Sequence, residues 1–217
     1  MEGQTEETFV NRILKPHLAP FSVGVSAHVV VTKRVPGYTY GGGLSRYAQA
    51  ESDINLLLKQ DQGNDVRFTT MFDLYRLPND FPGYAAAVHS DPYRRVEALE
   101  NALKQEIPDS RFTPYIQLHE FEALLLSDPQ KFDSQFDYRA DGISRLVELV
   151  SQFTSPELIN DGDSTAPSKR IDDEIPEYKY VKASAGPLVA GKIGIPTLRS
   201  KCAHFAEWLA KLENLGR

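Results

Sequence analysis

Apolar residues recur three and four positions apart in several stretches of the chain, which is the pattern of a helix with one buried face. The clearest case is residues 91–107, where a proline directly follows Asp91 in the first turn. At the start of the chain the same spacing predicts a helix over residues 5–18, with Thr5 as its N-cap and a bend or an end near Pro16. The predicted helices together cover residues 5–18, 44–60, 91–107, 120–126, 142–153 and 197–215.

Short runs of β-branched and apolar residues predict strands over residues 26–32, 66–74 and 112–118. These runs lack strict alternation, so each strand is expected to be buried on both faces of a mainly parallel sheet. Residues 34–43 are predicted to form a loop, 154–180 an irregular segment and 187–195 a short stretch of small residues. The fold class is therefore α/β, in a single domain of residues 1–217 with a helical extension from about residue 140.

The predicted order of elements begins with a helix, whereas a strand–helix–strand unit would have a strand before Glu2. Two explanations are open: that strand is absent from the chain, or the start at Met1 was assigned too late. We favour the second, which predicts in-frame apolar codons just upstream of Met1. The first strand of the sheet is thus expected to be missing or truncated.

Three carboxylates stand where predicted strands end or begin, namely Glu2, Asp73 and Glu120. Ligands of parallel α/β sheets gather beyond the carboxyl ends of the strands, so these side chains are expected to meet at one rim. Each also has a structural alternative. Glu2 can lie in an exposed terminus, where its charge only stabilises the dipole of the following helix. Asp73 can pair with Arg76, and His119 beside Glu120 can be a structural histidine.

Glu122 lies two positions after Glu120, so the two cannot share one face of a helix well. One of them is expected to face the site, while the other faces solvent or caps the helix. Carboxylates that crowd together repel, and a hard divalent cation with oxygen ligands removes the repulsion. The residues thus predict a site for Mg²⁺ or Mn²⁺ made by Glu2, Asp73, Glu120 and Glu122, suited to phosphodiester chemistry.

The chain has 24 lysines and arginines against 30 aspartates and glutamates, a net charge of −6, which excludes a globally basic nucleic-acid-binding surface. Basic residues nevertheless gather locally. Lys169 and Arg170 follow a turn-rich stretch that is expected to hold them away from any helix face, and they are candidates for phosphate contact. Lys179 and Lys182 lie in residues 178–206, which contain no acid; the alternative is that they are solvated or pair with acids elsewhere.

Other features narrow the class of protein. Cys202 is the single cysteine, so an internal disulfide is excluded and a cytoplasmic location is the simplest. Cys202 lies on the apolar face of the last predicted helix and is therefore expected in the core. No apolar stretch is long enough to span a membrane. The glycine run at residues 41–43 lacks the lysine of a phosphate-binding loop.

Several long motifs resemble a known family. The segments EGQTEETFV, FTTMFDLYRLPNDFPGY, QLHEFEALLLSDP, INDGDSTAPSKRI and CAHFAEWLAKL are similar to domain of unknown function 4276, a family regarded as Toprim-like. Toprim domains occur in topoisomerases, primases and nucleases of the overcoming-lysogenization-defect type. The resemblance implies a compact α/β sheet around Mg²⁺, with a glutamate at the end of the first strand and aspartates at the end of a later one.

Carried onto this sequence, the resemblance matches Glu2 to the strand-end glutamate and Asp73 to the later acidic position. Tyr75 stands where the second aspartate of the Toprim pattern would be, and Glu120 or Glu122 is a candidate for the missing carboxylate. Members of the family resemble components encoded beside ABC-type or AAA-type ATPases in anti-phage defence loci. An ATPase partner is therefore implied by analogy.

The leading hypothesis is a Mg²⁺-dependent, Toprim-like nuclease acting in phage defence. In this hypothesis Glu2 is a general acid/base or a metal ligand, and Asp73 and Glu120 are metal ligands. Lys169 is predicted to be catalytic and to contact phosphate together with Arg170. The alternative is a non-catalytic Toprim-shaped partner or sensor subunit of an ATPase, which the absent second aspartate favours. A weaker third hypothesis is nucleotidyl transfer at the same cation site.

Overall fold

The computed structural model describes residues 1–35, 38–41, 43–75, 77–89, 91–159, 162 and 165–216. Contacts between Cα atoms divide the chain into two compact units, each built from two separate segments. Unit 1 comprises Met1–Gln4 and His28–Gln117, and unit 2 comprises Thr5–Ala27 and Leu118–Arg217. The single domain with a helical extension from about residue 140 stays a prediction, although the C-terminal segment of unit 2 begins at Leu118.

Unit 1 contains two short pairs of parallel strands. Strand β3 (Phe68–Thr69) pairs with β5 (Phe112–Thr113), and β4 (Phe72–Asp73) pairs with β6 (Ile116–Gln117). Between the two strand pairs, the hydroxyl of Thr70, and not its backbone, forms the hydrogen bonds to the Tyr115 backbone. It donates to the Tyr115 carbonyl at 2.8 Å and accepts from the Tyr115 N–H at 2.9 Å. The predicted strands over 66–74 and 112–118 are thus each interrupted, beside a proline at 114 that has no N–H to donate.

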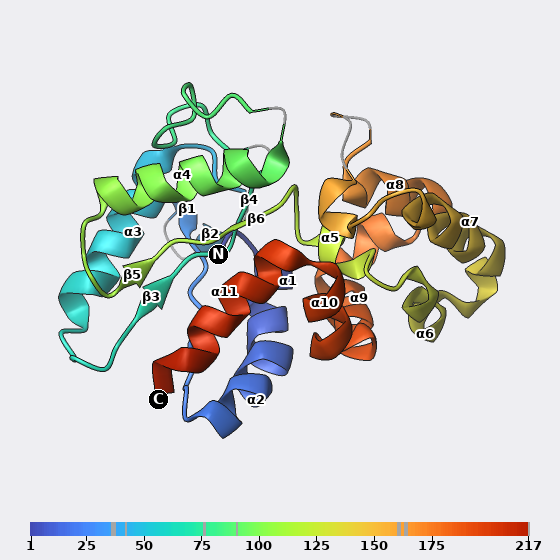
Figure 1. Ribbon diagram of the computed structural model, residues 1–217, viewed down its shortest axis with the longest axis horizontal. Coiled ribbons are helices and arrows are strands. Elements are labelled where there is room, and N and C mark those ends of the chain that lie inside the picture. Colours follow the sequence, from blue (N-terminus) through green and yellow to red (C-terminus); the bar gives the residue numbers. More distant parts are fainter. Residues whose placement is uncertain are drawn as a thin grey trace. The chain divides into compact units, whose positions relative to one another are not determined.

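Two long helices flank these strands (Figure 1). Helix α3 (Tyr47–Gln60) and helix α4 (Pro92–Glu106) lie close to the predicted ranges. The Asp91 side chain caps α4 by accepting from the Tyr93 N–H, and the buried face of α4 carries Val96, Leu99 and Leu103. From the same helix, Glu100 accepts the Ile116 N–H at 2.8 Å and so holds α4 against β6.

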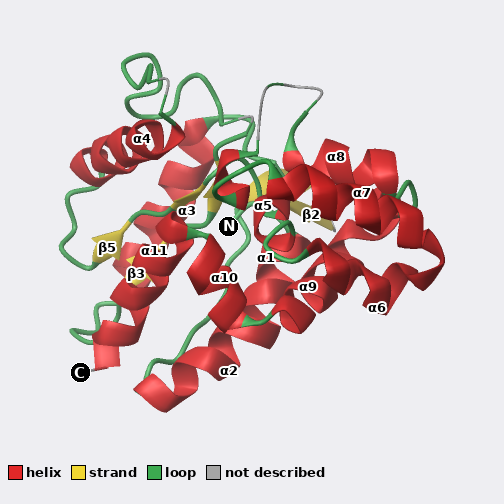
Figure 2. Ribbon diagram, turned by 45° about the vertical axis from the view of Figure 1, so that its right-hand side comes forward, coloured by secondary structure: helices red, strands yellow, loops and turns green. Residues whose placement is uncertain are grey.

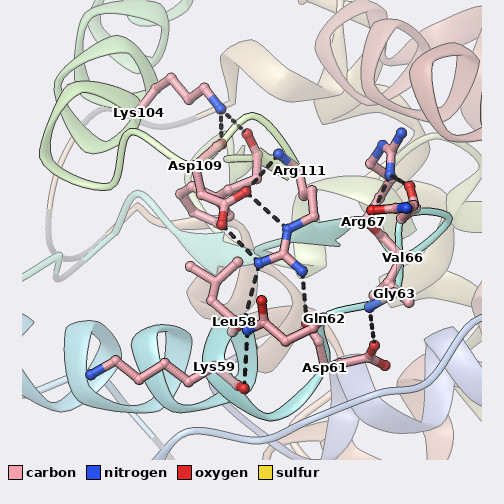
Figure 3. A network of polar contacts seen from close by, with 12 residues as sticks. Leu58, Lys59, Asp61, Gln62, Gly63, Val66, Arg67, Lys104, Asp109 and Arg111 are labelled. Carbon is pink, nitrogen blue, oxygen red and sulfur yellow. Dashed lines mark hydrogen bonds and ion pairs between the residues drawn. The ribbon is translucent and has the colours of Figure 1, made fainter.

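A polar network joins the end of α3 to the start of β5 (Figure 3). The Arg111 guanidinium donates to the carbonyls of Leu58 at 3.0 Å and Asp61 at 2.7 Å, which satisfies carbonyl groups at the helix C-terminus. It also pairs with Asp109 at 2.8 Å, while Lys104 donates to the Asp109 carbonyl. Arg111 therefore stabilises the packing of a helix end on a strand.

An antiparallel hairpin in unit 1 corrects two predictions. Strand β1 (Val31–Val35) pairs with β2 (Tyr38–Gly41), so the strand predicted over 26–32 begins later, and the loop predicted over 34–43 contains strand residues on both sides of positions 36–37. Residues 36, 37 and 42 lie outside the described residues. The prediction was wrong because strand pairing depends on the partner strand, which the local pattern does not show.

The predicted N-terminal helix forms, with different ends. It runs as α1 (Gln4–Phe9), a π-helical segment η1 (Val10–Leu14) and α2 (Lys15–Leu18), followed by the 3-10 turn η2 (Ala19–Phe21). Thr5 lies inside the helix and is not its N-cap. The chain stays helical past Pro16, which follows directly after the π-helical segment η1.

The rest of unit 2 is helical. Its described elements are α5 (Glu122–Leu125), η3 (Pro129–Phe132), α6 (Asp133–Phe136), η4 (Asp137–Arg139), α7 (Ala140–Ser151), η5 (Pro156–Leu158), α8 (Pro167–Glu174), α9 (Tyr178–Ile193), α10 (Ile195–Lys201), α11 (Ala203–Glu213) and η6 (Asn214–Gly216). Helix α7 lies close to its predicted range. The segment 154–180, predicted to be irregular, contains α8, and residues 187–193 continue α9 through Pro187. Both errors came from reading prolines as helix breakers, although Pro167 starts a helix.

The closing helix predicted over 197–215 is divided at Cys202, where the backbone leaves the helical region. The buried Glu157 carboxylate caps the second piece, α11, by accepting the N–H groups of His204 at 3.1 Å and Phe205 at 3.0 Å. Cys202 lies in the core as predicted, 3.2 Å from the Ser127 hydroxyl.

The predicted fold class is confirmed in outline: short parallel strands are flanked by helices, and the C-terminal part is helical (Figure 2). Within the described part of the chain, no helix combines the length and the apolar character that crossing a membrane requires.

Candidate functional site

Unit 1 brings together two of the predicted site residues, Glu2 and Asp73. One Glu2 carboxylate oxygen accepts the Asp73 N–H at 3.0 Å, and the other accepts the Leu44 N–H at 3.2 Å. Met1 anchors this arrangement, since its carbonyl accepts the Val30 N–H at 3.0 Å. Asp73 ends β4, so the Glu2 carboxylate lies beside the carboxyl end of that parallel strand, whereas sequence analysis expected it at the end of a separate first strand.

Unit 2 holds a second and larger group of acids, which we call the carboxylate cluster: Glu6, Glu120, Glu122 and Asp172. The first three are each 7% exposed, although they are charged residue types. The Asp172 side chain is 15% exposed, and its Oδ2 lies 3.3 Å from the Lys182 ammonium, which is also 4.0 Å from Glu122 Oε1. Buried acids so close to one another require compensation, from protons or from cations.

A strained turn positions two members of this cluster. His119, directly before Glu120, has φ = 62°, a left-handed conformation that is uncommon for residues other than glycine. Helix α5 begins only at Glu122, so Glu120 lies before the helix. Both side chains are buried, which corrects the expectation that one would face solvent. Glu120 does act as a cap, but of another helix: it accepts the Ser168 N–H at the start of α8.

Burial and neighbouring charge act together on Glu122. Desolvation is the largest cause and the negative charge of Glu120 the next; together they raise the pKa of Glu122 to about 8, against the opposing effect of Lys182. The charge of Glu6 adds to the increase. The Tyr178 hydroxyl donates to Glu122 Oε1 at 3.2 Å, and burial beside Glu122 raises the pKa of this tyrosine. Burial and the neighbouring carboxylates therefore favour the protonated form of Glu122.

The predicted phosphate contacts fall into two groups. Lys169 and Arg170 occupy the first turn of α8, next to Ser168, whose N–H binds Glu120. This corrects the expectation that Lys169 and Arg170 would stand away from any helix face. Because a helix N-terminus attracts anions, the position suits the predicted contact with phosphate. Lys179 is exposed and its ammonium lies 4.7 Å from the centre of the Tyr180 ring. Lys182 is paired with acids, the alternative that sequence analysis left open.

The predicted Mg²⁺ or Mn²⁺ site stays a prediction. Among the residues that the structure places, no three His, Cys, Asp or Glu side chains are arranged to hold a metal ion. Mg²⁺, however, is commonly bound through one or two carboxylates and otherwise by water and substrate phosphate. The all-oxygen donors of the cluster fit that kind of site, with Glu120 and Glu122 as the residues that would hold the ion.

Comparison with protein-family models gives a match over residues 1–213, to a domain of unknown function. The chain belongs to the DUF4276 family. No curated protein and no solved structure matches it. The predicted family is confirmed, whereas the relationship of DUF4276 to Toprim proteins and to nucleases of the overcoming-lysogenization-defect type stays a prediction.

In this DUF4276 chain, sequence reasoning missed three residues of the cluster and its surroundings. Glu6 gave no signal of its own, because an acid in the first turn of a helix is ordinary. Asp172 and Tyr178 carried no signal, because they reach Glu120 and Glu122 only through the packing of α8 and α9 against α5. An acid directly after a predicted strand, such as Glu120, was the one local pattern that pointed to this place.

Proposed function

We propose that this protein cleaves phosphodiester bonds of nucleic acids in a reaction that depends on a divalent cation, with Mg²⁺ or Mn²⁺ bound at the carboxylate cluster. The observation that carries the proposal is the crowding of Glu120 and Glu6 around the buried Glu122, which raises the pKa of Glu122 to about 8. Strongly perturbed carboxyl groups gather at functional sites, and a cation relieves the same repulsion that a proton relieves here.

Different residues of the chain would have different roles in the proposed reaction. The Ser168 N–H fixes Glu120, and the Tyr178 hydroxyl fixes Glu122, so both carboxylates are held before a ligand arrives. Lys169 and Arg170, on the first turn of α8, would bind substrate phosphate. A bound cation supplies activation of water and neutralisation of the leaving oxygen.

The Glu2–Asp73 pair of unit 1 is kept in the proposal as a second set of predicted cation ligands. Its backbone hydrogen bonds fix the Glu2 carboxylate at a strand end, a position typical of ligand sites in parallel α/β sheets. Substitution of Asp73 by asparagine tests this pair separately from the carboxylate cluster.

A second candidate function is a non-catalytic subunit that works with an ATPase in phage defence. Two observations favour it: Tyr75 replaces the second aspartate of the Toprim pattern, and no group of three acids in the described chain is arranged around an ion. A cytoplasmic location fits both functions. Cleavage of nucleic acid by the purified protein distinguishes the two candidate functions.

The test is cleavage of plasmid DNA, single-stranded DNA and RNA by the purified full chain with Mg²⁺, with Mn²⁺ and with EDTA. We expect metal-dependent cleavage that Glu120→Gln and Glu122→Gln reduce about 100-fold or more, as for the loss of a metal ligand or catalytic carboxylate. Lys169→Ala should weaken substrate binding. Glu148→Gln, at an exposed position of α7 in the same unit, is the matched control. Cleavage that is equal in all variants, or absent with every substrate, would contradict the proposal.

A further inference from the structure

Tyr180 occupies an exposed position in the first turn of helix α9. It is 78% exposed, the largest value among the exposed large apolar side chains described in unit 2. The Lys179 ammonium lies 4.7 Å from the centre of its ring, and among the ion pairs of the described residues none includes Lys179. An aromatic ring is therefore presented to solvent together with a positive charge that no acid neutralises.

The turn that carries Tyr180 is fixed to the core of unit 2. Tyr178, two positions earlier, is fully buried, and its ring centre lies 5.6 Å from that of Phe132 and 6.3 Å from that of Phe136. The Tyr180 N–H donates to the Glu177 carbonyl at 3.1 Å. Because the backbone on the N-terminal side of the ring is held in place, a flat ligand that stacks on Tyr180 would order little of the chain.

The exposed side of α9 carries positive and no negative charge. Residues 178–206 contain no aspartate or glutamate, and Glu177, the acid that directly precedes them, pairs with Arg139. Beyond Tyr180 the exposed residues of the helix are Val181, Ser184, Leu188, Gly191 and Lys192. At a rise of about 1.5 Å per residue, Lys192 lies roughly 18 Å along the helix from Tyr180. One lysine thus lies beside the ring and another at the far end of the same helix.

The distribution of exposed apolar surface favours a nucleic-acid strand over a protein partner. Val181 and Leu188 are 39% and 40% exposed, so the one large side chain of α9 that is mostly exposed is the Tyr180 ring. Surfaces that bind proteins are usually contiguous apolar patches of more than about a few hundred Å². Sites for single-stranded nucleic acid instead combine aromatic side chains, on which bases stack, with cations that bind the phosphates.

We propose that the exposed side of α9 binds single-stranded nucleic acid, with a base stacked on Tyr180 and backbone phosphates bound by Lys179 and Lys192. The inference rests on the proposed function, because it takes nucleic acid as the substrate, and it adds that the preferred substrate is a single strand. A duplex would bind less well, since its bases already stack on one another and offer no free face to the Tyr180 ring.

The test is fluorescence anisotropy of a labelled oligothymidine with the purified full chain, in EDTA so that no metal-dependent cleavage occurs. Tyr180→Ala should weaken binding about tenfold, as for the loss of one stacked base, whereas Tyr180→Trp keeps a stacking surface and should bind at least as tightly as the wild type. A duplex of the same length should bind more weakly, and Tyr180→Ala should change its affinity little.

Tyr138→Ala is the matched control for the exposed ring. Tyr138 is 64% exposed and has the Arg139 guanidinium 5.7 Å from its ring centre, but the exposed Asp137 directly precedes it and Arg139 is paired with Glu177. Tyr138→Ala should therefore bind the oligothymidine as the wild type does. Equal weakening by Tyr138→Ala and Tyr180→Ala would overturn the inference, because any exposed tyrosine would then have the same effect.

Salt dependence tests the two lysines. Lys179→Ala and Lys192→Ala should each reduce the slope of log affinity against log salt concentration by about 0.7, the value for one phosphate contact of a single strand. Lys211→Ala, at an exposed position of α11 in the same unit, should leave the slope unchanged. If all three variants change the slope equally, the contacts are not specific to α9 and the inference is wrong.

A protein partner and a failure of the proposed function give different results. If the wild type binds no single strand at micromolar concentration, or if Tyr180→Ala dissociates a dimer in analytical ultracentrifugation without changing the affinity for the oligothymidine, the inference is overturned. If single strands bind through Tyr180 but no nucleic acid is cleaved with Mg²⁺ or Mn²⁺, the binding surface stands and the nuclease does not. If Tyr180→Ala binds and cleaves single strands as the wild type does, only the role of α9 is wrong.

Discussion

Glu2 in unit 1 and Glu122 in unit 2 are the same residue type in opposite electrostatic surroundings. Two backbone N–H groups, from Asp73 and Leu44, point at the two oxygens of Glu2. Glu122 has one tyrosine hydroxyl, one backbone hydrogen bond and a lysine ammonium at 4.0 Å, and it lies near the negative charges of Glu120 and Glu6. The first arrangement stabilises a negative charge and the second opposes one.

The comparison shows that the donors and neighbours of a carboxylate decide whether its negative charge is stabilised. Backbone N–H groups are fixed dipoles that need no other charge, so Glu2 acts as a structural link between three parts of unit 1. In the carboxylate cluster, burial and the charges of Glu120 and Glu6 oppose a negative charge on Glu122, so its ionisation depends on pH.

The largest expected effect in this comparison is that of Glu2→Gln. The new amide group would direct its NH₂ at one of the two backbone N–H donors, leaving that donor without an acceptor, at a cost of about 1–3 kcal/mol in the free energy of unfolding. Urea unfolding followed by circular dichroism measures the change. Glu97→Gln, at an exposed position of α4 in the same unit, should cost almost nothing. If Glu2→Gln left the free energy of unfolding unchanged, the two hydrogen bonds of Glu2 would not stabilise unit 1.

The same substitution at Glu122 should have the opposite sign. The pKa of this carboxyl group rises from 4.5 to about 8 on folding, so the folded state binds the proton more tightly. Its contribution to stability is complete below pH 4.5 and is lost as the pH rises through about 8. In EDTA, Glu122→Gln should therefore change stability little at pH 4 and increase it by roughly 1 kcal/mol at pH 9.

The measurement is urea unfolding of the wild type, Glu122→Gln and the exposed control Glu148→Gln between pH 4 and 9. The wild type and the control should lose stability together over this range, while Glu122→Gln should have a flatter profile. If all three profiles coincide, Glu122 stays ionised in the folded protein, and the contrast with Glu2 disappears.

The smallest expected effect concerns Asp109, an acid of unit 1 with a strong partner. The hydrogen bonds of Arg111 lower the pKa of Asp109 from 3.8 to about 2. Because the folded pKa is lowered, the pair stabilises the protein above pH 3.8, and this contribution is lost as the pH falls towards 2. Asp109→Asn should thus lower stability slightly at pH 7 and leave the acid-unfolded state unchanged, as acid titrations by circular dichroism would show.

Helices with complete local signals were predicted well from the sequence. For α4 the capping aspartate, the following proline and the apolar spacing lie within residues 91–107 and agree with one another. The strands were predicted less well, because the interruption at Thr70 depends on a hydroxyl that bonds Tyr115, 45 positions away. Such pairing leaves no mark in the local pattern of either segment.

The candidate site shows the same division. Sequence reasoning selected Glu120 and Glu122 because charged residues that follow an apolar strand need a reason to be there. It could not show that both would be buried, since that depends on the left-handed turn at His119 and on Ser168, 48 positions away. Lys182 was interpreted as a phosphate contact because residues 178–206 contain no acid, but its partner Asp172 lies just outside that segment.

The sequence by itself determined the helices with strong caps and apolar faces, the family, and the acids that stand next to strands. The tertiary structure alone decided which of those acids are satisfied by backbone donors, as Glu2 is, and which are crowded, as Glu122 is. The reason is physical: helix formation depends on neighbours within a few positions, whereas the ionisation of a buried group depends on every charge and dipole that folding brings near it.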